Sequence, residues 1–177
     1  WDAINRFELE TDFPIFLQLE TNQICNLKCP SCPIGQEDGD KKYISDQKMG
    51  WDMYKKIILE GEKYGCPSVE PQGTNEPLLL KDFEKYLKYA HDKNFIDIMI
   101  NTNGSALTEK RSKQLLDSGI TRLRFSLDAA TPETYAKVRV GSLPLAKVHK
   151  NIMRFLELKE QGGYKLPVTG VSMCVMK

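Results

Sequence analysis

Three cysteines close together in the sequence could do metal chemistry. Cys25, Cys29 and Cys32 form a C-x3-C-x2-C pattern, and thiolates at this spacing on one loop can reach a common soft metal centre. Zinc usually takes four ligands, and the two histidines, His91 and His149, lie far away in helical patterns. Three thiolates on a [4Fe–4S] cluster would instead leave one iron open to bind a substrate. The pattern alone leaves zinc and an iron–sulfur cluster as alternatives.

The other cysteines do not indicate disulfides. The chain has five cysteines, an odd number, and a chain of 177 residues does not need disulfides to stabilise its fold. Cys66 and Cys174 are isolated, and we predict that both are small buried side chains in or beside strands. Reduced thiols with one local cluster are typical of a cytoplasmic protein.

Length and charge exclude several classes of protein. A chain of 177 residues is expected to form one domain with a substantial core. Its 25 Lys and Arg nearly balance 24 Asp and Glu, which argues against a protein that binds nucleic acid through its whole surface and against a polybasic membrane surface. The apolar runs are too short to cross a bilayer. The first residues resemble no signal peptide and lack an initiator Met, so we expect the chain to begin inside a longer polypeptide.

Short strand-like segments alternate with helical patterns along the chain. Hydrophobic periodicity, turn residues and caps predict both kinds of element. The predicted strands are residues 13–20, 68–71, 95–101, 121–127 and 168–176. The predicted helices are residues 46–64, 81–94, 132–138 and 145–161, together with one that Thr108 caps and that ends at Gly119. This alternation indicates βαβ units and a parallel sheet.

Polar segments follow four of the predicted strands. A parallel sheet of this kind is either doubly wound or a barrel, and no G-x-G-x-x-G follows a strand to support a dinucleotide-binding fold. The polar segments are residues 25–32, 72–76, 101–104 and 126–128. In (β/α) barrels the carboxyl ends of the strands form the rim on which sites are built. We therefore expect one site assembled from these segments.

The same segments resemble, in order, the motifs of the radical S-adenosylmethionine (SAM) enzymes. The cysteine triplet is similar to the cluster motif of that family. The GTNEPLL segment at residues 73–79 resembles its Gly/Glu-Pro segment, and NTNG at residues 101–104 resembles the end of its third strand. SLD at residues 126–128, followed by TPETYAKVR at residues 131–139, resembles the fourth strand and the next helix. The similarity covers about residues 13–177, nearly the whole chain.

This resemblance implies an α/β fold, a partial (β/α)6 TIM-like barrel with a parallel sheet. Only five strands are readable, so we expect the barrel to be truncated after the fifth strand. An N-terminal arm, residues 1–12, would precede a radical SAM core domain, residues 13–177, that is incomplete at its C-terminus. The fourth-strand motif also resembles the branch whose members carry C-terminal extensions with auxiliary clusters (SPASM-type).

The resemblance also implies two cofactors, a [4Fe–4S] cluster and SAM. Cys25, Cys29 and Cys32 would hold the cluster, and its open iron would chelate the amino and carboxylate groups of SAM. One electron would cleave SAM to a 5′-deoxyadenosyl radical, which would abstract a hydrogen atom from the substrate. The residues assigned to SAM binding are Gly73, Thr74, Asn75, Glu76, Asn103, Ser126, Asp128 and Arg139.

Individual roles follow from the side-chain chemistry and the resemblance. The turn that ends at Glu76 would approach the methionyl amino group through backbone carbonyls, and Glu76 would help to hold that group. Arg139 suits the methionyl carboxylate because its planar fork carries a fixed charge. Ser126 would bond the same carboxylate or the ribose. Asp128 could instead cap the following turn, and Asn103 belongs to an Asn-Gly dipeptide that forms turns in many proteins.

The sequence thus predicts a radical SAM enzyme that modifies a peptide or protein, with a small molecule or sugar as the alternative substrate. It would need a one-electron donor such as a flavodoxin or ferredoxin, and it would bind neither nucleic acid nor a membrane. Two other functions stay open. The cysteine triplet could bind structural zinc, or the chain could be a non-catalytic remnant that holds the cluster without acting on a substrate.

Overall fold

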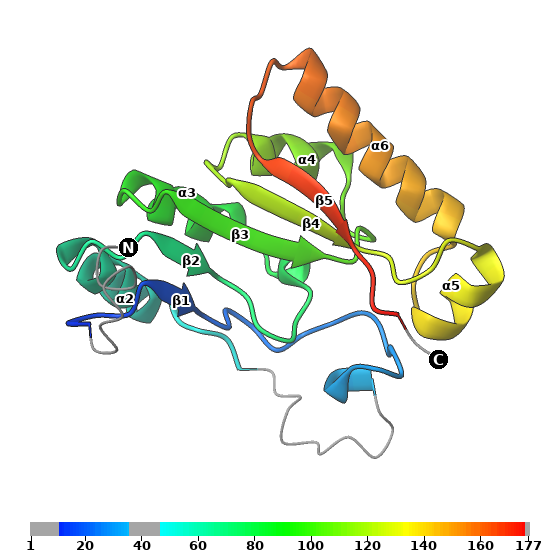
Figure 1. Ribbon diagram of the computed structural model, residues 1–177, viewed down its shortest axis with the longest axis horizontal. Coiled ribbons are helices and arrows are strands. Elements are labelled where there is room, and N and C mark those ends of the chain that lie inside the picture. Colours follow the sequence, from blue (N-terminus) through cyan, green and yellow to red (C-terminus); the bar gives the residue numbers. More distant parts are fainter. Residues whose placement is uncertain (1–10, 36–46, 176–177) are drawn as a thin grey trace.

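Five strands form one parallel sheet in a computed structural model that describes residues 11–35 and 47–175 (Figure 1). The strands are β1 (Phe16–Gln18), β2 (Ser68–Glu70), β3 (Asp97–Thr102), β4 (Arg122–Ser126) and β5 (Val168–Ser172). Their order in the sheet follows the sequence, and each strand is parallel to its neighbours. The predicted α/β fold is confirmed. The sheet is an open, partial barrel with β1 and β5 at its edges.

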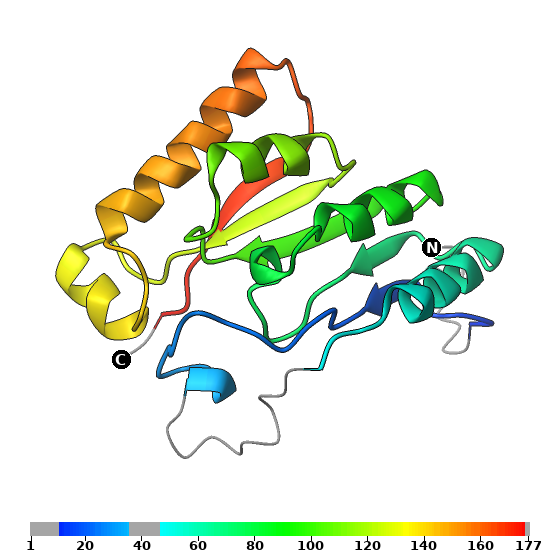
Figure 2. The same cartoon turned by 180° about the vertical axis from the view of Figure 1, so that it is seen from behind.

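The helices cover one face of this sheet. They are α2 (Trp51–Lys63), α3 (Glu84–Asp92), α4 (Glu109–Leu116), α5 (Pro132–Val138) and α6 (Leu145–Gln161), with short 3-10 turns η1 (Pro33–Gly35) and η3 (Pro77–Leu79). Figure 2 shows α2, α3, α4 and α6 in front of the strands, whereas in Figure 1 the strands lie in front. In the described part of the chain, the second face of the sheet is left without a covering helix.

The core lies between the sheet and these helices. Ile98 and Ile100 of β3 and Leu123 of β4 are completely buried there, and Phe125 packs edge-to-face on Phe155 of α6 with 6.0 Å between ring centroids. Successive side chains of a strand point to opposite faces. The helix-free face therefore carries the residues in between, which on β3 and β4 are Asp97, Met99, Asn101, Arg122, Arg124 and Ser126.

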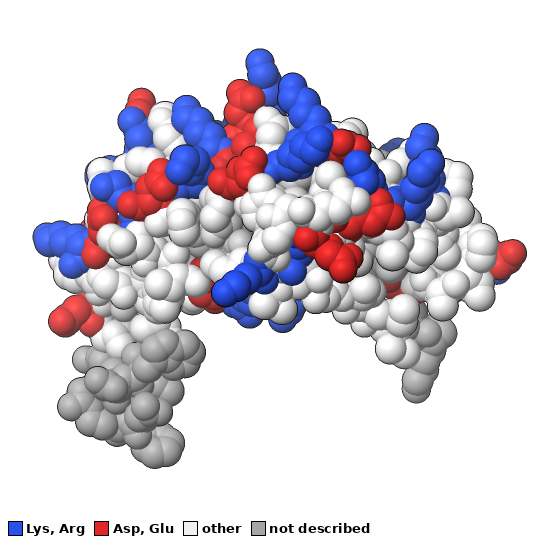
Figure 3. Space-filling model, turned by 90° about the horizontal axis from the view of Figure 1, so that it is seen from above, with Lys and Arg blue, Asp and Glu red and all other residues white. Residues whose placement is uncertain are grey.

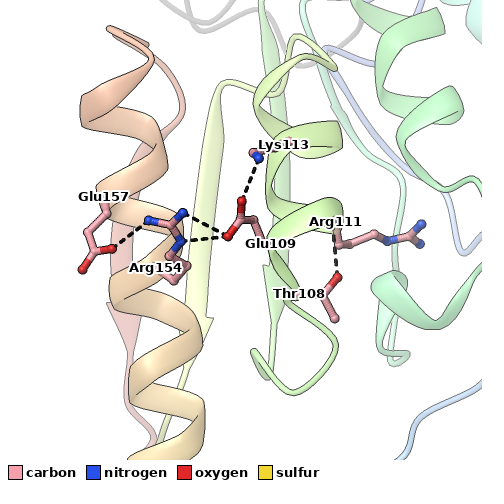
Figure 4. Close-up of polar contacts among 6 residues, drawn as sticks. All are labelled: Thr108, Glu109, Arg111, Lys113, Arg154 and Glu157. Atoms are coloured by element: carbon pink, nitrogen blue, oxygen red, sulfur yellow. Dashed lines mark hydrogen bonds and ion pairs between the residues drawn. The ribbon is translucent and has the colours of Figure 1, made fainter.

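Capping residues and ion pairs fix α4 and α6. Thr108 Oγ1 accepts the Arg111 N–H at the start of α4, as an N-cap does. Glu109 then links α4 to α6, because it accepts hydrogen bonds from both Lys113 and Arg154 (Figure 4). Arg154 also pairs with Glu157 one turn further along α6. These contacts hold the two helices beside each other on the outer face.

Several predicted boundaries were wrong. The first strand is three residues, shorter than predicted, and α2 begins at Trp51 rather than at residue 46 because the segment before it pairs with the chain after β1. There the Met49 N–H donates to the Thr21 carbonyl at 3.0 Å. The last strand ends at Ser172 rather than at residue 176. Cys66 is buried as predicted, but Cys174 is exposed.

Lys and Arg alternate with Asp and Glu over the face shown in Figure 3, so neither sign dominates it. Of the helices in the described residues, none is both long and apolar enough to cross a membrane. The predicted arm, residues 1–12, lies almost wholly outside the described residues, so that domain boundary stays a prediction.

Candidate functional site

A cavity of about 260 Å³ opens at the carboxyl ends of the strands. Every predicted site residue lines it: Cys25, Cys29, Cys32, Gly73, Thr74, Asn75, Glu76, Asn103, Ser126, Asp128 and Arg139. Five further residues complete the wall, namely Leu27, Ser31, Gln72, Asn101 and Thr102. A larger hollow, of about 470 Å³, surrounds Trp51 and Tyr89 on the helical side and shares no residue with this wall. The expected assembly of four segments at one rim is therefore present.

The cysteine loop after β1 is fastened to two other parts of the rim. The Lys28 N–H donates to the Val140 carbonyl at 2.8 Å, and the Glu76 N–H donates to the Ile24 carbonyl at 2.9 Å. Gly141 allows the first contact: its φ is +85°, and a Cβ there would lie 3.2 Å from the Asn26 carbonyl oxygen. The loop is thus held from the α5 side and from the β2 side.

The three thiols of this loop line the cavity and form no disulfide. All five cysteines are free; Cys29 is buried, and Cys25 and Cys32 are half-buried. Burial raises the pKa of the Cys25 and Cys29 thiols, and the Arg139 guanidinium, with Nη1 3.9 Å from Cys29 Sγ, opposes that rise at Cys29. Across residues 11–35 and 47–175, no three His, Cys, Asp or Glu side chains converge on a single ion position.

Glu76 is buried beneath the rim, and its carboxylate accepts hydrogen bonds from three donors. Its Oε1 accepts the Leu78 N–H at 3.2 Å and the Thr102 hydroxyl at 2.8 Å, and its Oε2 accepts the Asn103 N–H at 2.7 Å. Burial raises the pKa of this carboxyl, and the three hydrogen bonds oppose the rise. Its oxygens already have partners in the chain, so the carboxylate joins the ends of β2 and β3.

Asn103 connects the β3 end to the cysteine loop. Its Nδ2 donates to Asn26 Oδ1 at 3.0 Å, while its Oδ1 accepts the Ser105 N–H at 2.9 Å. The second bond is the Asx-type turn expected for an Asn-Gly dipeptide. The first bond was not foreseen, because it joins residues 77 apart in the sequence.

Glu20 shapes the turn after β2 and was missed from the sequence. Its Oε1 accepts both the N–H and the hydroxyl of Thr74, each at 2.9 Å. A Cβ added to Gly73 would lie 2.5 Å from the same oxygen, so any other residue there would displace the Glu20 carboxylate. The place of Glu20, just past β1 on the same rim, is the signal that could have revealed it.

Arg139 and Asp128 form an ion pair at the mouth of the site. Nη2 of Arg139 lies 2.6 Å from Oδ2 of Asp128, and Oδ1 of Asp128 accepts the Cys174 N–H at 2.8 Å. Arg139 Nε is buried and has no hydrogen-bond partner among the described residues. A buried donor without a partner costs about 1–3 kcal/mol, so an acceptor bound in the cavity would be stabilising.

Comparison with known proteins identifies the family. The model of the radical SAM superfamily matches residues 19–173. The chain belongs to this superfamily. It is 33% identical over 135 residues to a probable GTP 3′,8-cyclase of Methanococcus maripaludis, a match that covers 76% of this chain and 43% of that protein. It is also 27% identical over 165 residues to a tungsten-containing aldehyde ferredoxin oxidoreductase cofactor-modifying protein of Pyrococcus furiosus, covering 92% of this chain and 44% of that one.

A solved structure supports the fold. Streptococcus suis SuiB bound to S-adenosylmethionine superposes with a TM-score of 0.72 at 18% identity, over 99% of this chain and 37% of SuiB. The radical SAM chain described here spans less than half the length of these relatives. The SPASM-type extension therefore stays a prediction.

The residues present fit the cofactors that the radical SAM family uses, a [4Fe–4S] cluster and SAM. Three free thiols supply the soft ligands such a cluster takes, and they line a cavity rather than meeting at one point. The Arg139 side chain lines the same cavity, and its buried Nε has no hydrogen-bond partner in the described part of the chain, which suits an anionic group.

Proposed function

We propose that this chain holds a [4Fe–4S] cluster through Cys25, Cys29 and Cys32 and uses it to cleave SAM reductively. The observation that carries the proposal is that these thiols and all the predicted SAM-binding residues line one cavity. When bound and reduced, the cofactors supply an electron and a 5′-deoxyadenosyl radical that abstracts a hydrogen atom from the substrate. The chain itself binds and orients the reacting groups.

Arg139 is the residue we assign to the methionyl carboxylate. Its guanidinium is nearly buried, its Nε lacks a partner among the residues that the structure describes, and Asp128 holds it on one side. A charge-assisted hydrogen bond from such a donor is strong because little water competes for it. Asp128 acts as the positioning residue for Arg139. Ser126, on the same wall, donates to the carboxylate or the ribose in this proposal.

Glu76 acts in the proposal through the backbone. Its carboxylate accepts hydrogen bonds from three of the chain's own donors, so it joins the start of η3, just after the turn at Gly73–Asn75, to the end of β3 rather than binding the methionyl amino group by itself. The carbonyls of that turn, together with Asn103 at the next strand end, remain our assigned contacts to SAM.

A small-molecule substrate fits the relatives better than the peptide or protein favoured from the sequence. The curated relatives named above are a probable cyclase of GTP and a protein that modifies a cofactor. We therefore propose a small-molecule substrate, with a one-electron donor such as a flavodoxin or ferredoxin as partner. The cytoplasmic location stays a proposal and is supported by five free thiols.

Electron paramagnetic resonance (EPR) tests the proposed function. The protein is reconstituted with iron and sulfide without oxygen, reduced, and measured with and without SAM. A [4Fe–4S]⁺ signal that shifts when SAM is added is the expected result. A cluster signal that ignores SAM would indicate the non-catalytic remnant. Zinc in place of iron, with a colourless protein, would overturn the proposal.

A further inference from the structure

The helix-free face of the sheet is mostly polar on β2, β3 and β4, where Met99 is its apolar residue, and Phe16 of β1 lies on the same face. The register places Asn101 of β3 beside Arg124 of β4, and Arg124 beside Gly170 of β5. The neighbours of Arg124 along the strand, Leu123 and Phe125, are buried under the helices, so Arg124 extends from the opposite face. The cavity of the proposed function lies at the end of this same face, where Asn101 and Ser126 line it.

The carboxylates on this face are bonded by the chain's own donors. Glu70 accepts a hydrogen bond from Asn101 Nδ2 at 2.8 Å. Asp97 accepts one from Ser68 Oγ at 2.7 Å and one from Arg122 Nε at 2.6 Å. Asp97 therefore holds the Arg122 guanidinium in place, so Arg122 has a structural role on β4.

Arg124 differs from Arg122 because its guanidinium is not bonded. It is exposed, and within residues 11–35 and 47–175 it makes no hydrogen bond or ion pair. Its charge attracts Glu70 only through space: burial raises the pKa of Glu70, while the Asn101 hydrogen bond and the charge of Arg124 oppose that rise. On its other side, a Cβ added to Gly170 would meet nothing within 4 Å. There is thus open space beside a cation whose donors have no partner among the described residues.

The distance to the cavity suits a substrate anchor. Arg124 is two residues before Ser126 on the same face, and two strand residues span about 6.6 Å. A small molecule bound by Arg124 would therefore extend toward the cavity wall formed by Asn101 and Ser126.

We propose that Arg124 binds an oxyanion of the small-molecule substrate, a phosphate or a carboxylate, beside the cofactor cavity. This inference rests on the proposed function for the reaction that the bound substrate would enter. The planar fork of arginine binds both kinds of oxyanion through two parallel hydrogen bonds. Arg124 would therefore favour an anionic substrate over its neutral analogue.

Calorimetric titration tests the assignment with two probes, inorganic tripolyphosphate for phosphate and citrate for carboxylate. The reconstituted protein with SAM is compared with Arg124→Gln, Arg124→Lys and a control, Arg154→Gln, which removes an arginine from the outer face of α6. We expect at least one probe to bind. Arg124→Gln should weaken that binding about tenfold or more, as for a lost charge-assisted bond, and Arg124→Lys should weaken it less.

The two probes also distinguish a phosphate from a carboxylate as the anionic group of the substrate. Tighter binding of tripolyphosphate supports a phosphate-bearing substrate, and tighter binding of citrate supports a carboxylate. The inference is overturned if neither probe binds, if Arg124→Gln binds as the wild type does, or if Arg154→Gln loses as much affinity. The EPR response of the wild type to SAM is read separately. If the wild type shows no EPR response to SAM but binds the anion in a way that depends on Arg124, the proposed function is rejected and the anion site is retained.

Discussion

Arg139 and Asp128 pair across 2.6 Å with only 12% and 10% of their side-chain surfaces exposed. The pair joins the end of α5 to the turn after β4, where Asp128 has a φ of +59°. Because the second oxygen of Asp128 accepts the Cys174 N–H, the same carboxylate also fixes the chain beyond β5. One acid therefore positions the cationic side of the cofactor cavity from three segments.

Replacing Asp128 should destabilise the fold. We expect Asp128→Asn to lower the free energy of unfolding by about 2 kcal/mol, because Arg139 loses its anionic partner in a nearly buried place. Urea denaturation followed by circular dichroism measures the change. Asp52→Asn is the control, since Asp52 pairs with Lys55 while 93% of its side chain is exposed, and it should have no measurable effect. Equal stability of the two variants would contradict the prediction.

Replacing Arg139 should weaken SAM binding without removing the cluster. We expect Arg139→Ala to lose about 1.5–3 kcal/mol of binding free energy, as for a hydrogen bond to a charged group. Titration of SAM against the EPR signal of the reduced protein measures the affinity, and the same spectra report the cluster. Arg154→Ala, on the outer face of α6, is the matched control and should bind SAM normally. Unchanged affinity in Arg139→Ala would return that residue to a purely structural role.

Local patterns predicted the elements whose signals are local. The helices Pro132–Val138 and Leu145–Gln161 match the predicted ranges, since caps and periodicity mark their ends. The rim was predictable because carboxyl ends of parallel strands meet at one edge. The start of α2 was not predictable, since it depends on the Met49 contact to Thr21, far away in the sequence.

Side-chain roles at the site were less predictable than their positions. The motif placed Glu76 at the cavity, but its bonds to Thr102 and Asn103 depend on how β2 and β3 align. Cys174 was predicted to be buried because it lies within the predicted strand, residues 168–176. It is exposed because β5 is the edge strand of the described sheet and ends before it.

Replacing Glu76 by its amide should disrupt the hydrogen bonds that join the ends of β2 and β3. In Glu76→Gln an NH2 group takes the place of one acceptor oxygen and faces another donor, either the Asn103 N–H or the Leu78 N–H and Thr102 hydroxyl. We expect a loss of about 1–3 kcal/mol in the free energy of unfolding, measured in urea. Glu109→Gln, on the surface of α4, serves as the control and should change stability far less. A Glu76→Gln protein as stable as the control would show that these hydrogen bonds contribute nothing to the free energy of unfolding.

Asp97 should make stability depend on acid pH through its pair with Arg122. Burial alone would raise the pKa of Asp97, but the hydrogen bonds from Arg122 and Ser68 outweigh it and hold the pKa below its ordinary 3.8. The folded state thus favours the ionised form, so this contribution is present above pH 3.8 and is lost as the pH falls through the folded-state pKa. Urea unfolding at a series of pH values should show the wild type losing its advantage over Asp97→Asn in that acid range. A difference that stays constant with pH would contradict this assignment.

The cysteine ligands can be tested one at a time against a cysteine outside the site. We expect Cys29→Ala to abolish the [4Fe–4S] signal after reconstitution, because two thiolates would leave two irons without a protein ligand. Cys174→Ala is the matched control: Cys174 is free and exposed, and only its backbone N–H bonds to Asp128, so the variant should bind iron and sulfide like the wild type. Iron and sulfide content together with the EPR spectrum report the result. A full four-iron signal in Cys29→Ala would remove Cys29 from the ligand set, and loss of the signal in Cys174→Ala would add a fourth cysteine to it.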